Sequence, residues 1–258
     1  MRRVICLSLL LLSNAPNAAD RLPLAAYNYP MLMSESTITG KGHGFVIDIV
    51  IAAASAAQFN AAIDYFPTKR ALLQGRTAAY AGSIGAVEQF SAAELREIDV
   101  VEITPMPLSL FYLHSNNKLP KEYRNLEELR AFQLSAVLGS AALPMFKQAG
   151  VPHETSDEID NCFGKLQRQR VDICAAVDIA AWDAINRLFP LDAAAFARYE
   201  RPLLTYRLSL NFNHHYRDVS TLLRRFSLGL ATIKQNGVYA DIVKRYYGNN
   251  APGELTPK

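Results

Sequence analysis

The polar and aromatic residues best placed for chemistry in this sequence stand where predicted strands end. Tyr27 and Tyr29 close the first predicted strand, and Gly139 with Ser140 stands between a strand and a helix. The first amide groups of a helix lack partners within it, so Gly139 and Ser140 could present N–H donors to a carboxylate or a phosphate. The two tyrosines could form aromatic walls around a small ligand. Both would also suit a packed core, and Ser140 could simply cap its helix.

A third candidate pair, Gly82 and Ser83, is predicted to end the strand formed by residues 77–84. A glycine lets backbone approach a ligand closely, and a serine offers a hydroxyl group. Ordinary packing positions would use the same residues. Ligands of open α/β sheets bind beyond the carboxyl ends of the strands, and all three pairs are predicted at such ends.

Motifs of the common enzyme classes are absent from the sequence. There is no GxSxG or HExxH word and no Walker phosphate loop. The glycine-rich stretch 40–44 lacks the strand and GxGxxG spacing of a dinucleotide site and is interpreted as a turn. His214 and His215 are adjacent, so their side chains diverge, and the other three histidines are scattered. We therefore predict no catalytic residue, no metal site and no cofactor.

Composition and charge indicate a globular protein without affinity for nucleic acid. Half of the 258 residues are hydrophobic and a fifth are charged, which excludes a mostly disordered chain. The formal net charge is only +3, and no dense run of lysine and arginine occurs. Binding to nucleic acid is therefore not expected.

The first nineteen residues have the layout of a secretory signal. Arg2 and Arg3 precede the apolar run 4–12, which is too short to span a bilayer, and small residues follow it up to Ala19. We expect cleavage after Ala19, within a residue or two; a buried strand or helix is the alternative interpretation. Removal of residues 1–19 would leave a net charge of +1, because they carry two of the 27 basic residues and no acidic one.

The rest of the chain alternates predicted strands and helices, which favours an α/β fold with a largely parallel sheet. Predicted strands cover residues 22–29, 61–66, 77–84, 132–138 and 171–177, and predicted helices cover 45–59, 68–73, 141–149, 157–170 and 180–188.

Two long extended segments and a helical tail complete this pattern. Residues 100–113 and 203–212 are apolar and extended, and Pro105 and Pro107 exclude a helix from the first. Apolar residues in the segment 219–247 follow the three-, four- and seven-residue spacing of core-facing helices.

Two cysteines, Cys162 and Cys174, remain after the predicted signal. Export makes a disulfide possible. The predicted helix and strand would bring the two residues to similar height, but layers about 10 Å apart strain the distance that a bridge needs. Free buried thiols and a disulfide therefore both remain open.

Four sequence words in order resemble the amino-acid-type periplasmic solute-binding proteins. They are GKGHGFVIDIVIAAA at 40–54, RALLQGR at 70–76, the Val-Asp…Asp word at 171–178 and the Gln-Asn-Gly…Gly ending at 235–248. Each word alone is weak. As an ordered set they cover almost all of residues 22–248 and follow an export signal.

This resemblance implies a two-lobed binding-protein fold of type II, with two hinge crossings and a C-terminal helical tail. The signal peptide would be residues 1–19, lobe one residues 20–110 plus 206–258, and lobe two residues 111–205. The lobes would close by hinge motion on a small polar solute, amino-acid-like or an amine. We expect a periplasmic monomer that binds without catalysis and delivers its ligand to an ABC-type permease or to a sensor.

The resemblance also assigns a role to Asp178, and one departure from the family pattern bears on it. The matching aspartate of the family pairs with the ligand's ammonium group; here Asp178 could instead only cap the following helix.

The family usually carries a Thr-x-x-Arg word after the third strand, where this sequence has residues 85–90 without an arginine. The next one, Arg96, is predicted to lie on the surface. An ordinary amino acid is thus one ligand among several, beside an amine, a small peptide-like compound or another polar metabolite.

Two further functions fit the same scaffold. A periplasmic enzyme of the dehydratase kind would need a proton donor at the cleft, and Glu35 and Glu88 stand in loops that could border it. Solvated loop acids would have the same sequence pattern. A scaffold that has lost binding and only contacts partners is the third interpretation.

Overall fold

The computed structural model describes residues 20–248 and 250–255, so the predicted signal segment 1–19 lies outside the described residues. Nine strands form one sheet in the order β2-β1-β3-β9-β4-β7-β5-β6, and β8 pairs with β4 beside this path. The strands are β1 (Asp20–Ala26), β2 (Phe59–Tyr65), β3 (Gly82–Ala86), β4 (Ile98–Leu113), β5 (Leu134–Val137), β6 (His153–Ser156), β7 (Ile173–Val177), β8 (Phe196–Arg198) and β9 (Leu204–Asn213).

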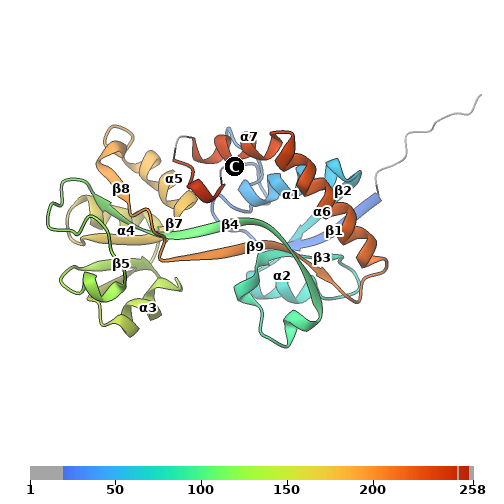
Figure 1. The fold of residues 1–258 in the computed structure, drawn as a ribbon, viewed down its shortest axis with the longest axis horizontal. Helices are drawn as coiled ribbons and strands as arrows, with labels where there is room; N and C mark the ends of the chain where they lie inside the picture. Colours follow the sequence, from blue (N-terminus) through green and yellow to red (C-terminus); the bar gives the residue numbers. More distant parts are fainter. Residues whose placement is uncertain (1–19, 249, 256–258) are drawn as a thin grey trace, which may run out of the picture.

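The two long segments are confirmed as the crossings between two lobes. β4 and β9 run antiparallel to each other from one lobe to the other (Figure 1). Within each lobe the neighbouring strands are parallel, β1 with β2 and β3, and β5 with β6 and β7. The predicted α/β alternation with a largely parallel sheet is therefore present in both lobes, with the crossings as its antiparallel exception.

Seven α-helices cover the described sheet. They are α1 (Phe45–Ala56), α2 (Thr68–Gln74), α3 (Ala142–Ala149), α4 (Ile159–Gln167), α5 (Asp178–Leu188), α6 (Val219–Gln235) and α7 (Val238–Tyr247). Helices α1, α2, α6 and α7 lie with β1–β3, and α3, α4 and α5 lie with β5–β8 (Figure 1). Within the described part of the chain, none of the helices combines the length and the apolar character that crossing a bilayer requires.

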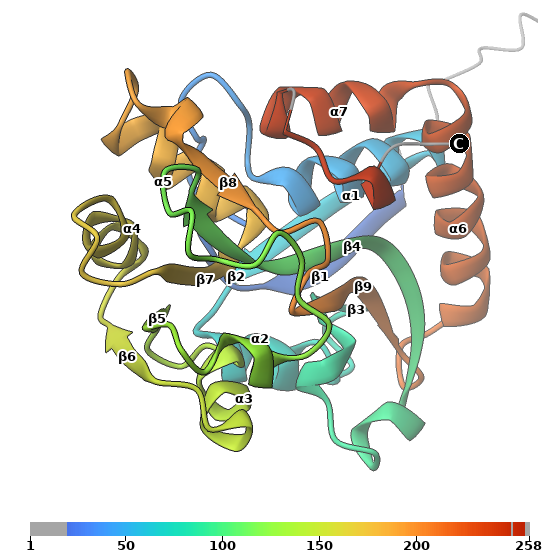
Figure 2. The same ribbon diagram turned by 60° about the vertical axis from the view of Figure 1, so that its left-hand side comes forward.

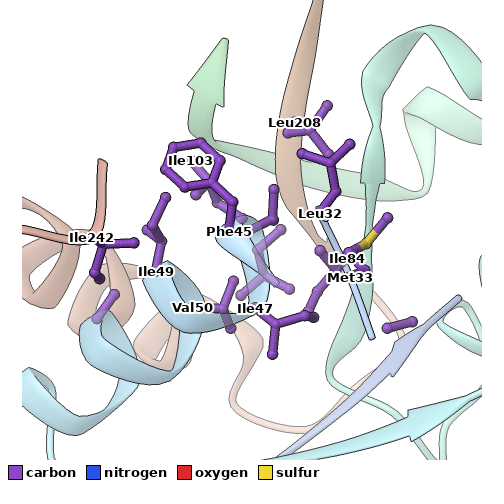
Figure 3. Close-up of a cluster of buried hydrophobic side chains, with 14 of the residues drawn as sticks. Leu32, Met33, Phe45, Ile47, Ile49, Val50, Ile84, Ile103, Leu208 and Ile242 are labelled. Atoms are coloured by element: carbon purple, nitrogen blue, oxygen red, sulfur yellow. The ribbon is translucent and has the colours of Figure 1, made fainter. Parts of the chain in front are cut away.

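The core of lobe one contains residues from the N-terminal and the C-terminal parts of the described chain. Figure 3 shows Phe45 and Ile49 of α1 beside Ile242 of α7, with Ile103 of β4 and Leu208 of β9 nearby. α1 is apolar over most of its surface, which suits a helix buried between the sheet and the two tail helices (Figure 2). The helical tail therefore packs into the core of lobe one, and its amphipathic spacing predicts such core-facing helices.

Lobe two contains two smaller cores on opposite faces of its sheet. Leu108 and Leu110 of β4 pack with α3 and β5 on one face. Phe111, the next residue of β4, packs with α4, α5 and β8 on the other. This alternation is the period of two expected for a strand that is buried on both sides.

A disulfide links Cys162 of α4 to Cys174 of β7. The two Cα atoms are 6.0 Å apart, within the range that a bridge requires and well below the layer spacing considered from the sequence. Both cysteines are buried. The bridge therefore fixes α4 against the central strand of lobe two.

Candidate functional site

Three tyrosines converge where lobe one meets the crossing strands. Tyr27 and Tyr29 follow the end of β1, and Tyr206 lies on β9. Burial raises the pKa of Tyr27 to about 12, and the nearby Tyr29 and Tyr206 phenols add to this increase. Burial and Tyr206 likewise raise the pKa of Tyr29. The two predicted aromatic residues thus lie together, and Tyr206 is a third member that the sequence analysis missed.

Gln89 holds the Tyr27 phenol in place. Tyr27 donates a 3.0 Å hydrogen bond to the Gln89 side-chain oxygen, which also accepts a 2.9 Å bond from the Ala86 amide. This is the segment after β3 in which no arginine was found in the sequence. At the place where lobe one meets the crossing strands, called the junction below, this segment therefore contributes the neutral amide of Gln89 and not a cation.

Tyr206 extends from β9 to the start of α3 in lobe two. Its aromatic ring packs against core residues of both lobes. Burial raises the pKa of Tyr206 and the Glu88 carboxylate adds to this, whereas a hydrogen bond from the Ala141 amide acts in the opposite direction. The Tyr206 hydroxyl therefore lies at the amide groups that begin α3.

Gly139 and Ser140 lie beside this contact, in the loop that leads into α3. Gly139 has φ of +82° and is exposed, and an added Cβ would meet no atom within 4 Å. The Ser140 hydroxyl accepts a 3.2 Å hydrogen bond from the Ala142 amide. The Ser140 hydroxyl is thus bonded to the first residue of α3, and its neighbour Ala141, the N-cap of that helix, contacts Tyr206.

Asp178 begins α5 and is completely buried, which places the predicted aspartate at the end of β7 as expected. Its carboxylate forms an ion pair with the Arg198 guanidinium of β8. Asp178 was predicted to meet a ligand's ammonium group; in the structure a cation of the chain itself faces it. Arg198 was missed because a three-residue strand leaves no recognisable pattern in the sequence.

The assignment of Gly82 and Ser83 to the end of the third strand is wrong. β3 is Gly82–Ala86, so both residues begin the strand, where they pair with Leu24 and Ala25 of β1. Ser83 is buried, and a Cβ added to Gly75 would stand 2.4 Å from its Cβ atom. A Cβ on Gly82 would lie 2.3 Å from the Asn211 carbonyl oxygen. The pair serves close packing, and Gly85 is the glycine beside the Tyr27 ring.

An ion pair joins the lobes on the side of α5 and α7. Lys41, in the glycine-rich turn of lobe one, lies 3.6 Å from the Asp183 carboxylate in α5. Both side chains are partly exposed, so the pair adds little stability by itself. It shows that the turn 40–44 faces lobe two.

The two glutamates considered as proton donors do not come together. Glu88 lies 3.0 Å from the Arg207 guanidinium. Its partial burial opposes ionisation, but hydrogen bonds from Arg207 outweigh that effect and lower the pKa of its carboxyl group. Glu35 is exposed and lines a hollow of about 470 Å³ with His43, Ile63 and other residues of lobe one. A carboxyl group with a lowered pKa is ionised at neutral pH and is a poor proton donor.

The junction of the two lobes with β9 presents groups that can contact a small solute. It offers phenol hydroxyl groups, backbone amides at a helix start and aromatic surface, all contributed from both lobes and one crossing strand. In residues 20–248 and 250–255, no group of three or more histidine, cysteine, aspartate or glutamate side chains could hold a metal ion.

Similar solved structures are solute-binding proteins and a sensor domain that resembles them. The L-cystine solute receptor of Neisseria gonorrhoeae in its unliganded open conformation is 12% identical at TM-score 0.70, over 91% of this chain and 95% of the receptor. An ancestral cationic amino acid solute-binding protein is 14% identical at TM-score 0.67, over 88% of this chain and 95% of that one. A histidine kinase sensor domain with similarity to periplasmic binding proteins is 16% identical at TM-score 0.61, over 90% of this chain and 98% of that domain.

The chain therefore has the type II, two-lobed fold of the amino-acid solute-binding proteins, as the ordered sequence words predict. No family model matches the sequence, and no curated protein is similar to it at the level of sequence. At these identities the likeness establishes the fold alone.

Proposed function

We propose that this protein captures a small polar solute between its two lobes, outside the cytoplasm, and delivers it to an ABC-type membrane permease. The proposal rests on the fold and on the predicted export signal. Capture would need no catalytic group, since the lobes only have to close on the solute and open again.

The observation that carries the proposal is the contact of Tyr206 with the start of α3. Tyr206 stands on a crossing strand, beside Tyr27 and Tyr29 of lobe one, and reaches the Ala141 amide of lobe two. A solute held there would touch both lobes and the strand between them. Such a position lets binding energy favour the closed arrangement of the lobes.

The site suits a solute with an acceptor group and a flat or apolar part. Backbone amides at a helix start bind carboxylate or other acceptor oxygens, and tyrosine rings pack on apolar or planar groups. We place the acceptor beside Gly139, Ser140 and Ala141, at the Tyr206 hydroxyl, which accepts a bond from the Ala141 amide and keeps its own O–H to donate to the solute. The rest of the solute would lie against the three tyrosines.

The test is thermal unfolding of residues 20–258 in the presence of amino acids, polyamines, short peptides, organic acids and sugars. One class should raise the melting temperature in a saturable manner. Tyr206→Phe, which loses only the hydroxyl, should then bind that solute roughly tenfold more weakly. Tyr80→Phe is the matched control, because the Tyr80 hydroxyl donates an exposed hydrogen bond to Asp64 within lobe one. Equal affinities of the two variants would exclude the assigned position.

Delivery to a permease and delivery to a sensor are separable once the solute is known. The similar sensor domain shows that the fold also serves signalling proteins. Loss of uptake of the solute in cells without this protein would support the permease. Unchanged uptake with a lost transcriptional or behavioural response would favour the sensor. Conversion of the solute into a product would instead establish the enzyme interpretation.

A further inference from the structure

The ion pair of Asp178 and Arg198 sets two opposite charges at the junction of the lobes. The Asp178 side chain is 0% exposed and that of Arg198 is 20% exposed. The residues on either side of Asp178, Val177 and Ile179, pack into the core of lobe one although they belong to β7 and α5. The carboxylate therefore stands between the lobes and is shielded from solvent.

The register of the sheet shows how the pair is built. The residue before Asp178 pairs with Leu108 of β4, whereas Arg198 pairs with Phe111 on the same strand. The guanidinium must therefore cross β4 diagonally to reach the carboxylate, over Ser109. Ser109 shares the face of Phe111, is completely buried, and its hydroxyl has no hydrogen-bond partner among the described residues.

Other polar groups surround this crossing. The indole N–H of Trp182, one turn after Asp178, is buried without a hydrogen-bond partner in the described part of the chain, and its ring packs 5.5 Å from that of Phe111. From lobe one, Tyr247 faces the pair: burial and the Asp178 carboxylate raise the pKa of Tyr247, and Arg198 opposes them. The site holds a hydroxyl group, an indole N–H and a phenol around one carboxylate and one guanidinium.

A buried carboxylate requires a positive partner, and Arg198 fills that position. A ligand ammonium group would have to displace a guanidinium that cannot lose its charge by deprotonation. Two other acids near the junction are also paired, Asp183 with Lys41 and Glu88 with Arg207. A cationic solute therefore meets no uncompensated negative charge among these groups.

We propose that Arg198 determines the charge class of the ligand: its guanidinium occupies the cation position at Asp178, so that the cleft accepts neutral or anionic solutes and rejects amines. This inference rests on the proposed capture of a solute and specifies its class. It differs from the expectation, drawn from the family resemblance, that Asp178 receives a ligand ammonium group.

The first test removes the guanidinium and supplies it from solution. Arg198→Ala should melt roughly 10 °C below the wild type, because the carboxylate loses this counter-charge. Methylguanidinium chloride should raise its melting temperature in a saturable manner, beyond the effect of sodium chloride at equal ionic strength. Arg187→Ala, which breaks the exposed pair with Asp160, is the matched control and should show no such response. A folded Arg198→Ala protein without the response would overturn the proposal.

A second variant covers the case in which Arg198→Ala does not fold. Asp178→Asn keeps the guanidinium and removes its carboxylate, so this protein should respond to acetate and not to methylguanidinium. The double variant Asp178→Asn/Arg198→Met has neither charge and should respond to neither probe. A response of the double variant equal to that of a single variant would show that the probes act elsewhere.

Binding measurements on the wild type distinguish a failure of this inference from a failure of the proposed function. Saturable stabilisation of the wild type by an alkylamine, lost in Asp178→Asn, would overturn the role of Arg198 and leave solute capture intact. A wild type that binds no solute of any class would instead overturn solute capture, and the rescue of Arg198→Ala would still show whether the guanidinium fills a cation position. Stabilisation by an organic acid or a neutral solute, with none by amines, supports both.

Discussion

The Tyr246 hydroxyl in α7 donates a 2.8 Å hydrogen bond to the Asp48 carboxylate in α1, although 198 positions separate the two residues. The same hydroxyl accepts a 2.9 Å bond from the Gly44 amide, and the other Asp48 oxygen accepts a 3.0 Å bond from the His43 amide. Asp48 therefore fastens both the glycine-rich turn and the last helix to α1. The turn also carries Lys41 toward lobe two.

Tyr246→Phe should lower the free energy of unfolding by roughly 1–3 kcal/mol, because the Gly44 amide and the Asp48 carboxylate lose a shared buried partner. Chemical unfolding measures this change. Tyr80→Phe is the control, since it removes an exposed hydrogen bond of the same type, 2.9 Å to Asp64. Its cost should stay within roughly 0.5 kcal/mol. Similar losses in the two variants would contradict the structural role of Tyr246.

Gly229→Ala should be strongly destabilising, because α6 crosses α1 at this glycine. A Cβ atom there would stand 2.1 Å from the Ala53 carbonyl oxygen, so the helices must separate. We expect a loss of roughly 3 kcal/mol in the free energy of unfolding. Gly164→Ala in α4 is the matched control: its Cβ would meet only the end of the Arg168 side chain at 3.6 Å. That variant should gain roughly 0.5–1 kcal/mol, and a loss at Gly164 would contradict the packing described.

Reduction of the Cys162–Cys174 disulfide should lower the free energy of unfolding by roughly 3 kcal/mol, the loop-closure value for a loop of this size. The loop is short, with a sequence separation of 12 residues. The measurement is unfolding by urea with and without a thiol reductant. Cys162→Ala/Cys174→Ala should match the reduced wild type and be insensitive to the reductant. If the reductant also destabilised the double variant, its effect on the wild type could not be assigned to this disulfide.

Alkaline pH should destabilise the protein through its buried phenols. Burial raises the pKa of Tyr27 to about 12, above the value of about 10 in an unfolded chain. Folding therefore favours the protonated phenol, and this stability is complete below about pH 10 and is lost as the pH rises toward 12. Unfolding by urea at a series of pH values should show the decline, and Tyr27→Phe should make it shallower. An unchanged slope in that variant would contradict the burial of Tyr27.

Much of the fold follows from local sequence patterns. Pro105 and Pro107 exclude a helix from a long apolar segment, and that segment is β4. The apolar spacing after residue 219 predicts both tail helices, which are α6 and α7. These predictions succeed because each depends on the conformation of a single continuous segment.

Predictions about short elements were less accurate. The strand expected at 77–84 is β3, Gly82–Ala86, and this shift moves Gly82 and Ser83 from the end of the strand to its beginning. β6 and β8 were not predicted at all. A strand of three to five residues is defined by the neighbour with which it pairs, and its own sequence carries little periodic signal.

The sequence alone therefore determined the order of the α-helices and the longer strands, the two crossings and the location of Tyr27, Tyr29, Ser140 and Asp178 at element ends. Only the tertiary structure decided which of these residues meet. Tyr206 reaches the start of α3, and Arg198 reaches Asp178, because β4 aligns β7 on one edge with β8 and β9 on the other. The physical reason is that strand register is set by pairing between segments far apart in the chain, and a side chain's partner depends on that register.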